Sequence, residues 1–239
     1  MEEDQRIREE VAVWKHKIQG RSGLFNRLAK KAQNKFNQVI PEKAHAVITE
    51  GIKGMVSATL FGSDFLTKPL AEKPQSLAEK EKLVKERFES YRKTAVLEGA
   101  GTGAGGILLG LADFPLLLSI KMKFLFEAAS IHGYDVKAYE ERIFMLQVFQ
   151  LAFSSDQHRK TVLHTIENWE TSKETLKEID WRTFQQEYRD YLDIMKMLQL
   201  IPGIGAVIGA YANFQLMDQL EETAVNAFRI RWLQEKTID

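Results

Sequence analysis

Apolar residues recur three and four positions apart along almost the whole chain, beginning with Ile7, Val11, Trp14 and Ile18. This spacing places them on one face of an α-helix, whereas a half-buried strand requires strict alternation, and no segment of the chain alternates in that way. Ser76 stands before another such stretch and is a predicted helix N-cap. The pattern therefore predicts an all-α fold.

At 239 residues, the chain is near the upper limit of what one hydrophobic core organises. Pro69 and Pro74 lie five positions apart and interrupt helix propagation. We therefore predict one multi-helix domain with an N-terminal helical arm at about 1–68, a linker at about 69–75 and a main body at 76–239.

The charge balance and the lack of cysteine exclude several classes of function. The 33 basic and 33 acidic residues give a formal net charge of zero, so no overall field favours nucleic-acid binding. The chain has no cysteine, which excludes disulfides and thiolate chemistry and fits a reducing compartment. Its first residues include Glu2, Glu3 and Asp4 and do not resemble a secretory signal, so a cytoplasmic protein is expected.

Two glycine-rich apolar segments stand out from the charged helices around them. Gly99 to Ile120 reads GAGTGAGGILLGLADFPLLLSI, with Asp113 as its only charge, and Met197 to Met217 reads MLQLIPGIGAVIGAYANFQLM, with none. The two segments resemble each other at an offset of one hundred positions, which indicates an internal repeat. The identical pairs are Gly103 and Gly203, Gly105 and Gly205, Ala112 and Ala212, and Phe114 and Phe214.

Glycines four positions apart lie on one helix face and let a second backbone approach closely. That spacing occurs at the pairs Gly101 and Gly105, Gly106 and Gly110, and Gly205 and Gly209. We therefore predict that the two segments pack against each other, with Pro202 at a helix start and Pro115 at a kink or a break after Phe114. Burial in a soluble core is favoured over a membrane span, and reversible membrane association stays open.

The segment from Lys15 to Lys35 is the one strongly basic stretch, and no acidic residue interrupts it. Lys15, Lys30 and Lys31 are its candidate membrane-surface residues, because basic amphipathic helices bind anionic lipid. A solvated basic face on a soluble helix is the favoured alternative.

Motifs for catalysis, cofactors and metals are missing. Gly101 to Gly106 formally matches GxGxxG, but a charged helix precedes it where a nucleotide-binding fold requires a strand. The five histidines show no metal-binding spacing, and the serines lie in no nucleophile motif. We therefore predict a non-enzymatic protein with no catalytic residues, no cofactor and no metal.

Three blocks of the chain resemble the EcsC family: Gly110–Leu117 (GLADFPLL), Ala128–Asp135 (AASIHGYD) and Ile201–Ala210 (IPGIGAVIGA). The resemblance implies a bacterial protein typically encoded beside an ABC transporter that is linked to secretion and membrane processing. It brings no activity and no catalytic residues. Asp113, Pro115, Gly133, Tyr134 and Asp135 carry over as motif positions only, with Gly133 expected to end one helix and Asp135 to cap the next.

Two functions follow from these observations. The favoured one is an accessory protein at the cytoplasmic face of the membrane, whose expected partners are ABC transporter subunits and an anionic membrane surface. The alternative is an enzyme or a small-ligand or lipid carrier, with a pocket between the two glycine-rich helices and with Asp113 and Asn213 as its polar pair. The oligomeric state is left open.

Overall fold

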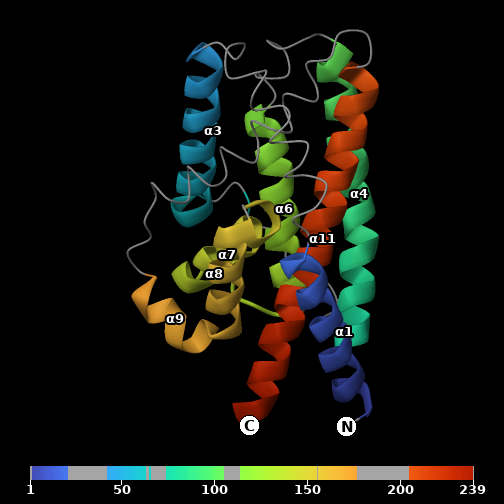
Figure 1. Cartoon of the computed structure of the whole chain (residues 1–239), viewed down its shortest axis with the longest axis vertical. Helices are drawn as coiled ribbons and strands as arrows, with labels where there is room; N and C mark the ends of the chain where they lie inside the picture. Colours follow the sequence, from blue (N-terminus) through green and yellow to red (C-terminus); the bar gives the residue numbers. More distant parts are fainter. Residues whose placement is uncertain are drawn as a thin grey trace.

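The computed structural model describes residues 2–20, 42–62, 65, 74–104, 114–154, 156–176 and 205–238. These residues form helices and no strand, which confirms the predicted all-α single domain (Figure 1). The helices are α1 (Glu2–Gln19), α3 (Glu42–Phe61), α4 (Leu77–Ala104), α6 (Phe114–His132), α7 (Tyr139–Phe153), α8 (Asp156–Glu167), α9 (Trp169–Thr175) and α11 (Gly205–Ile238).

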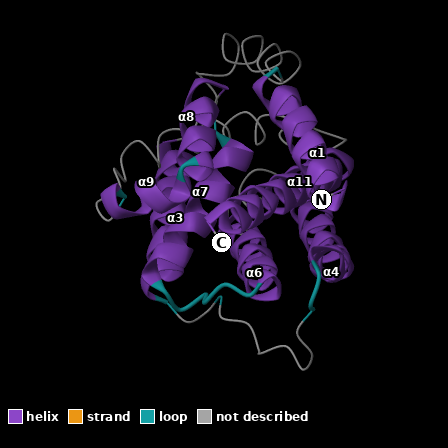
Figure 2. Cartoon of the chain, turned by 90° about the horizontal axis from the view of Figure 1, so that it is seen from below, coloured by secondary structure: helices purple, strands orange, loops and turns teal. Residues whose placement is uncertain are grey.

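The longest helices, α4 and α11, run antiparallel beside each other and form the most extensive interface among the described helices (Figure 1). In the view from below, α1, α4 and α11 lie on one side and α3, α7, α8 and α9 on the other, with α6 between them (Figure 2). Helix α6 contacts α3, α4, α7 and α11, so it joins the two sides of the molecule.

Helix α7 lies at the centre of the core. Every residue from Arg142 to Phe153 is buried, because α3, α6, α8 and α11 all pack against this helix. Aromatic rings fill the contacts around it: the Phe144 ring lies edge-on to Trp169 with centroids 4.9 Å apart. A helix that is buried on all sides needs no single apolar stripe. The sequence pattern predicted such a stripe and therefore understated the burial of α7.

Helix α1 packs on α11 and α8 through the predicted apolar stripe, whose four residues are all buried. Ion pairs run beside this stripe, including Asp4 with Lys236 at 2.9 Å. Helix α3 packs on α6 and α7. Both helices that precede the predicted linker thus share the core of the helices that follow it.

Helix α4 begins at a capping box, as Ser76 predicted. The Ser76 hydroxyl accepts a hydrogen bond from the Glu79 backbone N–H at 3.2 Å, and the Glu79 carboxylate accepts one from the Ser76 N–H at 3.1 Å. A second backbone N–H, that of Gln75, donates to the same carboxylate at 2.8 Å. These hydrogen bonds lower the pKa of Glu79, because they favour its ionised form.

Two buried arginines cap the ends of the N-terminal helices. Arg142 donates from Nη1 to the carbonyl oxygens of Leu60 and Gly62, at 3.1 and 2.8 Å, where α3 ends. Arg159 donates to the carbonyl oxygen of Ile18 at 3.2 Å, at the end of α1. The last carbonyls of a helix lack partners within it and carry partial negative charge, so a guanidinium satisfies both requirements.

Candidate functional site

The two glycine-rich segments come together at one end of the molecule. Helix α4 ends there and α11 begins there, so Gly101 on α4 and Gly205 and Gly209 on α11 all belong to the same end (Figure 1). Five other candidate glycine and acidic positions lie outside the described residues: Gly105, Gly106, Gly110, Asp113 and Gly203. Close packing of one glycine face on the other stays a prediction.

The first turns of α6 lie at this end as well. The predicted break after Phe114 does not occur, because the helix begins at Phe114 and continues through Pro115, and the alternative of a kink at Pro115 stays a prediction. Proline is tolerated in a first turn because its missing N–H has no intrahelical partner there. Pro115 and Leu116 are exposed, and Leu116 retains 45% of its accessible surface.

Three helix ends thus lie together, and none of the three contains a charged residue; we call these three helix ends the uncharged end. It consists of residues 99–104 of α4, 114–120 of α6 and 205–217 of α11. Exposed Leu97, at 72%, lies just beyond it on α4, where Glu98 separates it from residue 99. A fourth helix, α3, also begins toward this end and packs on α6, and its first turn contains Glu42 and Lys43 (Figure 1).

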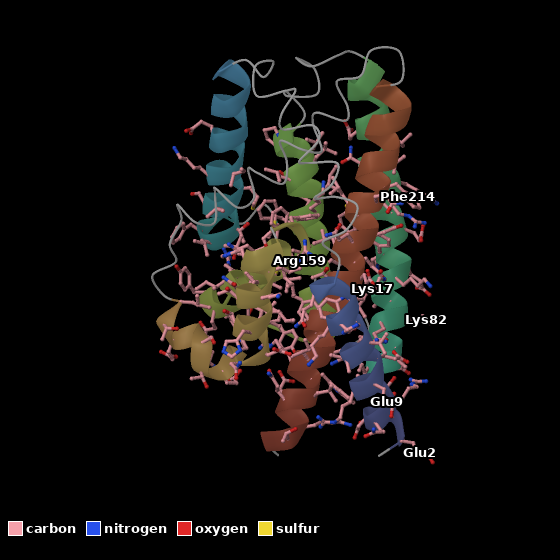
Figure 3. The ribbon with its side chains drawn as sticks, viewed as in Figure 1. Glu2, Glu9, Lys17, Lys82, Arg159 and Phe214 are labelled. Atoms are coloured by element: carbon pink, nitrogen blue, oxygen red, sulfur yellow. The ribbon has the colours of Figure 1, made fainter. Side chains whose placement is uncertain are left out.

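Charges begin where the uncharged end stops. Arg92 on α4 donates to Asp218 on α11 at 3.1 Å and to Glu89 at 2.6 Å, and its guanidinium lies 4.6 Å from the ring centroid of Phe214. Figure 3 shows Phe214 on the upper part of α11. Asn213, beside it in sequence, is buried at 1% exposure. Whether Asn213 pairs with Asp113 stays a prediction, since Asp113 is outside the described residues.

Lys121 on α6 is a buried cation just below the uncharged end. It is 3% exposed, and its ammonium lies 3.5 Å from the carbonyl oxygen of Leu117. Burial lowers the pKa of Lys121 to about 8, because desolvation disfavours the charged form. Sequence reasoning missed this residue, although a lysine between Ile120 and Met122 in an otherwise apolar stretch is the signal that marks it.

The second block of the family signature forms the turn between α6 and α7. Gly133 has a φ of 97°, the Tyr134 N–H donates to the Ala129 carbonyl at 3.0 Å, and the Gly133 N–H donates to Ser130 at 3.1 Å. This is a Schellman C-cap, and it explains the glycine, because other residues rarely adopt a positive φ. Gly133 thus ends α6 as expected.

Asp135 does not cap α7. Its carboxylate accepts a hydrogen bond from the Lys137 N–H at 3.0 Å, and the N-cap of α7 is Ala138, which makes no side-chain cap bond. Asp135 therefore shapes the turn that precedes the helix, as an Asx turn does.

Tyr134 anchors a cluster at the opposite end of the molecule from the glycines. Its ring stacks on Phe228 with centroids 5.6 Å apart, and its hydroxyl donates to Glu235 at 3.2 Å. The guanidinium of Arg231 lies 3.9 Å from the Tyr134 ring centroid and forms a two-bond pair with Glu141, at 2.5 and 2.9 Å. Arg231 is 6% exposed, so this is a buried ion pair with aromatic cover.

His132 belongs to the same cluster. It is 7% exposed, and its ring centroid lies 4.5 Å from that of Phe228. Neither ring nitrogen has a hydrogen-bond partner in the described part of the chain. Burial lowers the pKa of His132 to about 3, and the nearby charges of Lys80 and Arg231 act in the same direction. The ring is therefore neutral at physiological pH and serves as packing.

The candidate basic surface is only partly described. Lys15 forms an ion pair with Glu167 at 2.8 Å and is about one-third exposed, and Lys17 pairs with Glu222 on α11 (Figure 3 labels Lys17). Lys30 and Lys31 lie outside the described residues. The described part of this segment thus uses its lysines to hold α1 on α8 and α11.

A search of the described residues for metal ligands found no group of three or more His, Asp or Glu side chains able to hold an ion. Within the same residues, no helix combines the length and the apolar character that a membrane span requires.

Comparison with known proteins gives the family. No solved structure matches the chain. Protein EcsC of Bacillus subtilis (strain 168) is 53% identical over 235 residues, which cover 98% of each chain. The uncharacterized protein YdbA of the same strain is 31% identical over 146 residues, or 59% of this chain and 54% of YdbA. The model of the EcsC protein family matches residues 5–233. The resemblance seen in the three sequence blocks is thereby confirmed, and the chain belongs to the EcsC protein family.

Proposed function

We propose that the chain is a non-enzymatic accessory protein that binds at the cytoplasmic face of the cell membrane through its uncharged end and acts beside an ABC transporter. Its membership of the EcsC family supports the setting. The uncharged end supports the mode of contact, and it is the observation that carries the proposal.

A protein surface must lose its hydrating water to enter lipid. Transfer of a charged side chain from water into an apolar medium is costly, whereas burial of an exposed leucine contributes about 1.5 to 3 kcal/mol. No charged residue occurs in the ranges that make up the uncharged end, which are 99–104, 114–120 and 205–217. Leu97 and Leu116 add exposed apolar surface. Shallow insertion of these three helix ends would therefore gain apolar burial without desolvating an ion of their own.

Lys15 of the basic segment is expected to add little to lipid binding. Lys15 already has a carboxylate partner in Glu167, so binding a lipid phosphate would exchange one ion pair for another. An exposed ion pair is worth about 0 to 1 kcal/mol, and the exchange gains little. Contact with lipid should therefore depend more on apolar insertion than on the charge of Lys15.

Vesicle flotation with two matched variants tests this proposal. Leu97→Glu places a charge at the border of the uncharged end, and Val13→Glu places one on an equally exposed apolar position of α1, where 71% of Val13 is accessible. We expect wild type to float with phospholipid vesicles and Leu97→Glu to bind about tenfold more weakly, as the loss of roughly 1.4 kcal/mol implies. Val13→Glu should bind as wild type does.

Equal losses of vesicle binding in both variants, or no flotation of the wild type, would contradict contact through the uncharged end.

The association with the transporter is tested separately, by co-purification. Transporter subunits should co-purify with tagged wild type from detergent-solubilised membranes, and their absence would remove that part of the proposal.

A further inference from the structure

A groove with a volume of about 740 Å³ runs between α3 and α6. Small residues line its α3 side, among them Gly54 and Ala58, and Leu116 and Ser119 line its α6 side. Phe65 also lines it. The walls are therefore mostly apolar, and the volume lies in the range of about 300 to 1,000 Å³ that is typical of small-molecule sites.

Phe65 joins the groove to the core. It is 4% exposed, and its ring centroid lies 5.5 Å from that of Phe126 on α6. Met55, at 5% exposure, is a second buried lining residue. These packed side chains give the groove a fixed base, so its shape does not depend on exposed side chains alone.

Gly54 is a glycine without a packing reason inside the described chain. It lies within α3, where glycine costs about 1 kcal/mol relative to alanine. A Cβ built at this position would meet no atom within 4 Å, and its φ is not in the left-handed region. Among the described residues, none fills the space beside Gly54.

One lining charge of the groove has no counter-charge. Glu50 pairs with Lys53 at 3.0 Å, one turn along α3. Lys123 is exposed and forms no ion pair with any described residue. The groove therefore combines an apolar length with an uncompensated ammonium, which attracts a phosphate or carboxylate oxygen.

The Lys123 ammonium lies farther from the uncharged end than Leu116 does, along the direction of the groove. Helices α3 and α6 both start at that end of the molecule and run away from it (Figure 1). Lys123 follows Leu116 by seven positions, which is about 10 Å along a helix. An amphiphile with its head at Lys123 and its tail along Ser119 and Leu116 would direct that tail toward the uncharged end. A phospholipid in a leaflet entered by the uncharged end would have the same orientation, with its head group on the side of the cytoplasm and its tail toward the bilayer centre.

We propose that the groove between α3 and α6 binds one acyl chain of an anionic membrane phospholipid, with the lipid phosphate at Lys123. The proposal rests on the proposed function, because it names the ligand of the membrane-contacting region. It makes the protein a receptor for individual lipid molecules, and insertion of the uncharged end would bring the groove to them.

Calorimetric titration tests the groove without a bilayer. The probe is decanoyl lysophosphatidylglycerol, used below its critical micelle concentration, and decanoate serves as a second probe for a free fatty acid. Wild type should bind the lysophospholipid saturably at one site. Gly54→Phe should weaken binding at least tenfold by filling the groove. Gly54→Ala should stay within twofold, because a methyl group occupies little of it.

The charged position has a matched pair of variants. Lys123→Gln should weaken lysophospholipid binding about fivefold, whereas Lys160→Gln, at an exposed position of α8, should leave it unchanged. Circular dichroism melting of each variant controls for folding. If decanoate binds as tightly as the lysophospholipid, the ligand is a free acid, and the assignment to a membrane phospholipid is overturned.

Absence of saturable binding by wild type, or equal binding by wild type and Gly54→Phe, would overturn the groove proposal and leave the groove to a helix of a partner protein. Flotation separates this failure from failure of the proposed function. If wild type floats with vesicles and Leu97→Glu does not, the membrane contact stands while the groove proposal falls. If wild type neither floats nor binds the lysophospholipid, both fall together.

Discussion

The two ends of the molecule use polar chemistry in opposite ways. At the uncharged end, three helices meet without an ionic side chain. At the other end, which we call the ion-paired end, α1 and the last turns of α11 are tied by charges such as the pair of Asp4 and Lys236, and Arg231 is buried on Glu141. Charges that are already paired contribute to the fold, whereas a surface without charges is free to be buried elsewhere. The comparison therefore assigns stability to the ion-paired end, and the proposed function gives contact with lipid to the uncharged end.

The largest expected effect is at the buried ion pair. Arg231→Ala leaves the Glu141 carboxylate, which is 12% exposed, without its guanidinium. Removal of one member of a buried pair costs about 3 to 5 kcal/mol, so we expect the free energy of unfolding in urea to fall by that amount. Arg6→Ala, which breaks the exposed pair with Glu10, should cost less than about 1 kcal/mol.

Vesicle flotation of the same Arg231→Ala protein tests whether the two ends of the molecule have separate roles. Under conditions where it remains folded, it should float with vesicles as wild type does, because the change lies at the ion-paired end. A variant that is stable but no longer floats would show that the two ends are not separate in function.

His132 should make the ion-paired end sensitive to acid. The pKa of histidine in an unfolded chain is about 6.5, and in the folded protein that of His132 is about 3, so only the unfolded chain binds a proton between these values. Stability is therefore fully present above pH 6.5 and falls by up to about 1.4 kcal/mol for each pH unit below it. Lys80 and Arg231 are the charged groups that act on the ring, and both lower its pKa.

His132→Phe tests this with little change in packing, because the new ring can still lie against Phe228. Between pH 7 and pH 4.5, wild type should lose about 2 kcal/mol more than the variant in urea unfolding. Parallel pH profiles for the two proteins would show that His132 is not the group responsible.

The smallest expected effect is at Lys15. Lys15→Gln breaks the partly exposed pair with Glu167, and we expect the free energy of unfolding to change by less than about 1 kcal/mol. Flotation with anionic vesicles should change by less than twofold. A loss as large as that of Leu97→Glu would move the membrane contact from the uncharged end to the basic segment.

Local signals in the sequence predicted the helices and several of their ends. The spacing of Ile7, Val11, Trp14 and Ile18 predicted the buried face of α1, because helical period alone determines which residues share a face. Ser76 and Gly133 marked a start and an end for equally local reasons, since a cap and a positive φ depend on neighbouring residues.

The buried cations could not be predicted in the same way. Arg142 looks like a surface residue in the sequence, and only the packing of distant helices buries it. Lys121 is marked by the apolar residues on either side of it, but the sequence does not show which helices bury it. The groove is similar, because it joins α3 to α6 across segments far apart in the chain. Gly54 offered a faint signal, as a helix-interior glycine away from the two glycine-rich segments. The arrangement of elements, which fixes these sites, depends on contacts that local patterns do not encode.

The arginine caps can form only late in synthesis, because each arginine follows its helix by many residues. Ile18 ends α1, yet its guanidinium partner on Arg159 is synthesised 141 positions later. Glu222, the partner of Lys17, is synthesised 205 positions after it. At about 5 to 20 residues per second, the first helix spends roughly 10 to 40 seconds outside the ribosome tunnel before its partners exist. During that interval, the apolar stripe of α1 has no partner helix to cover it, so α1 is a segment that a ribosome-bound chaperone would bind.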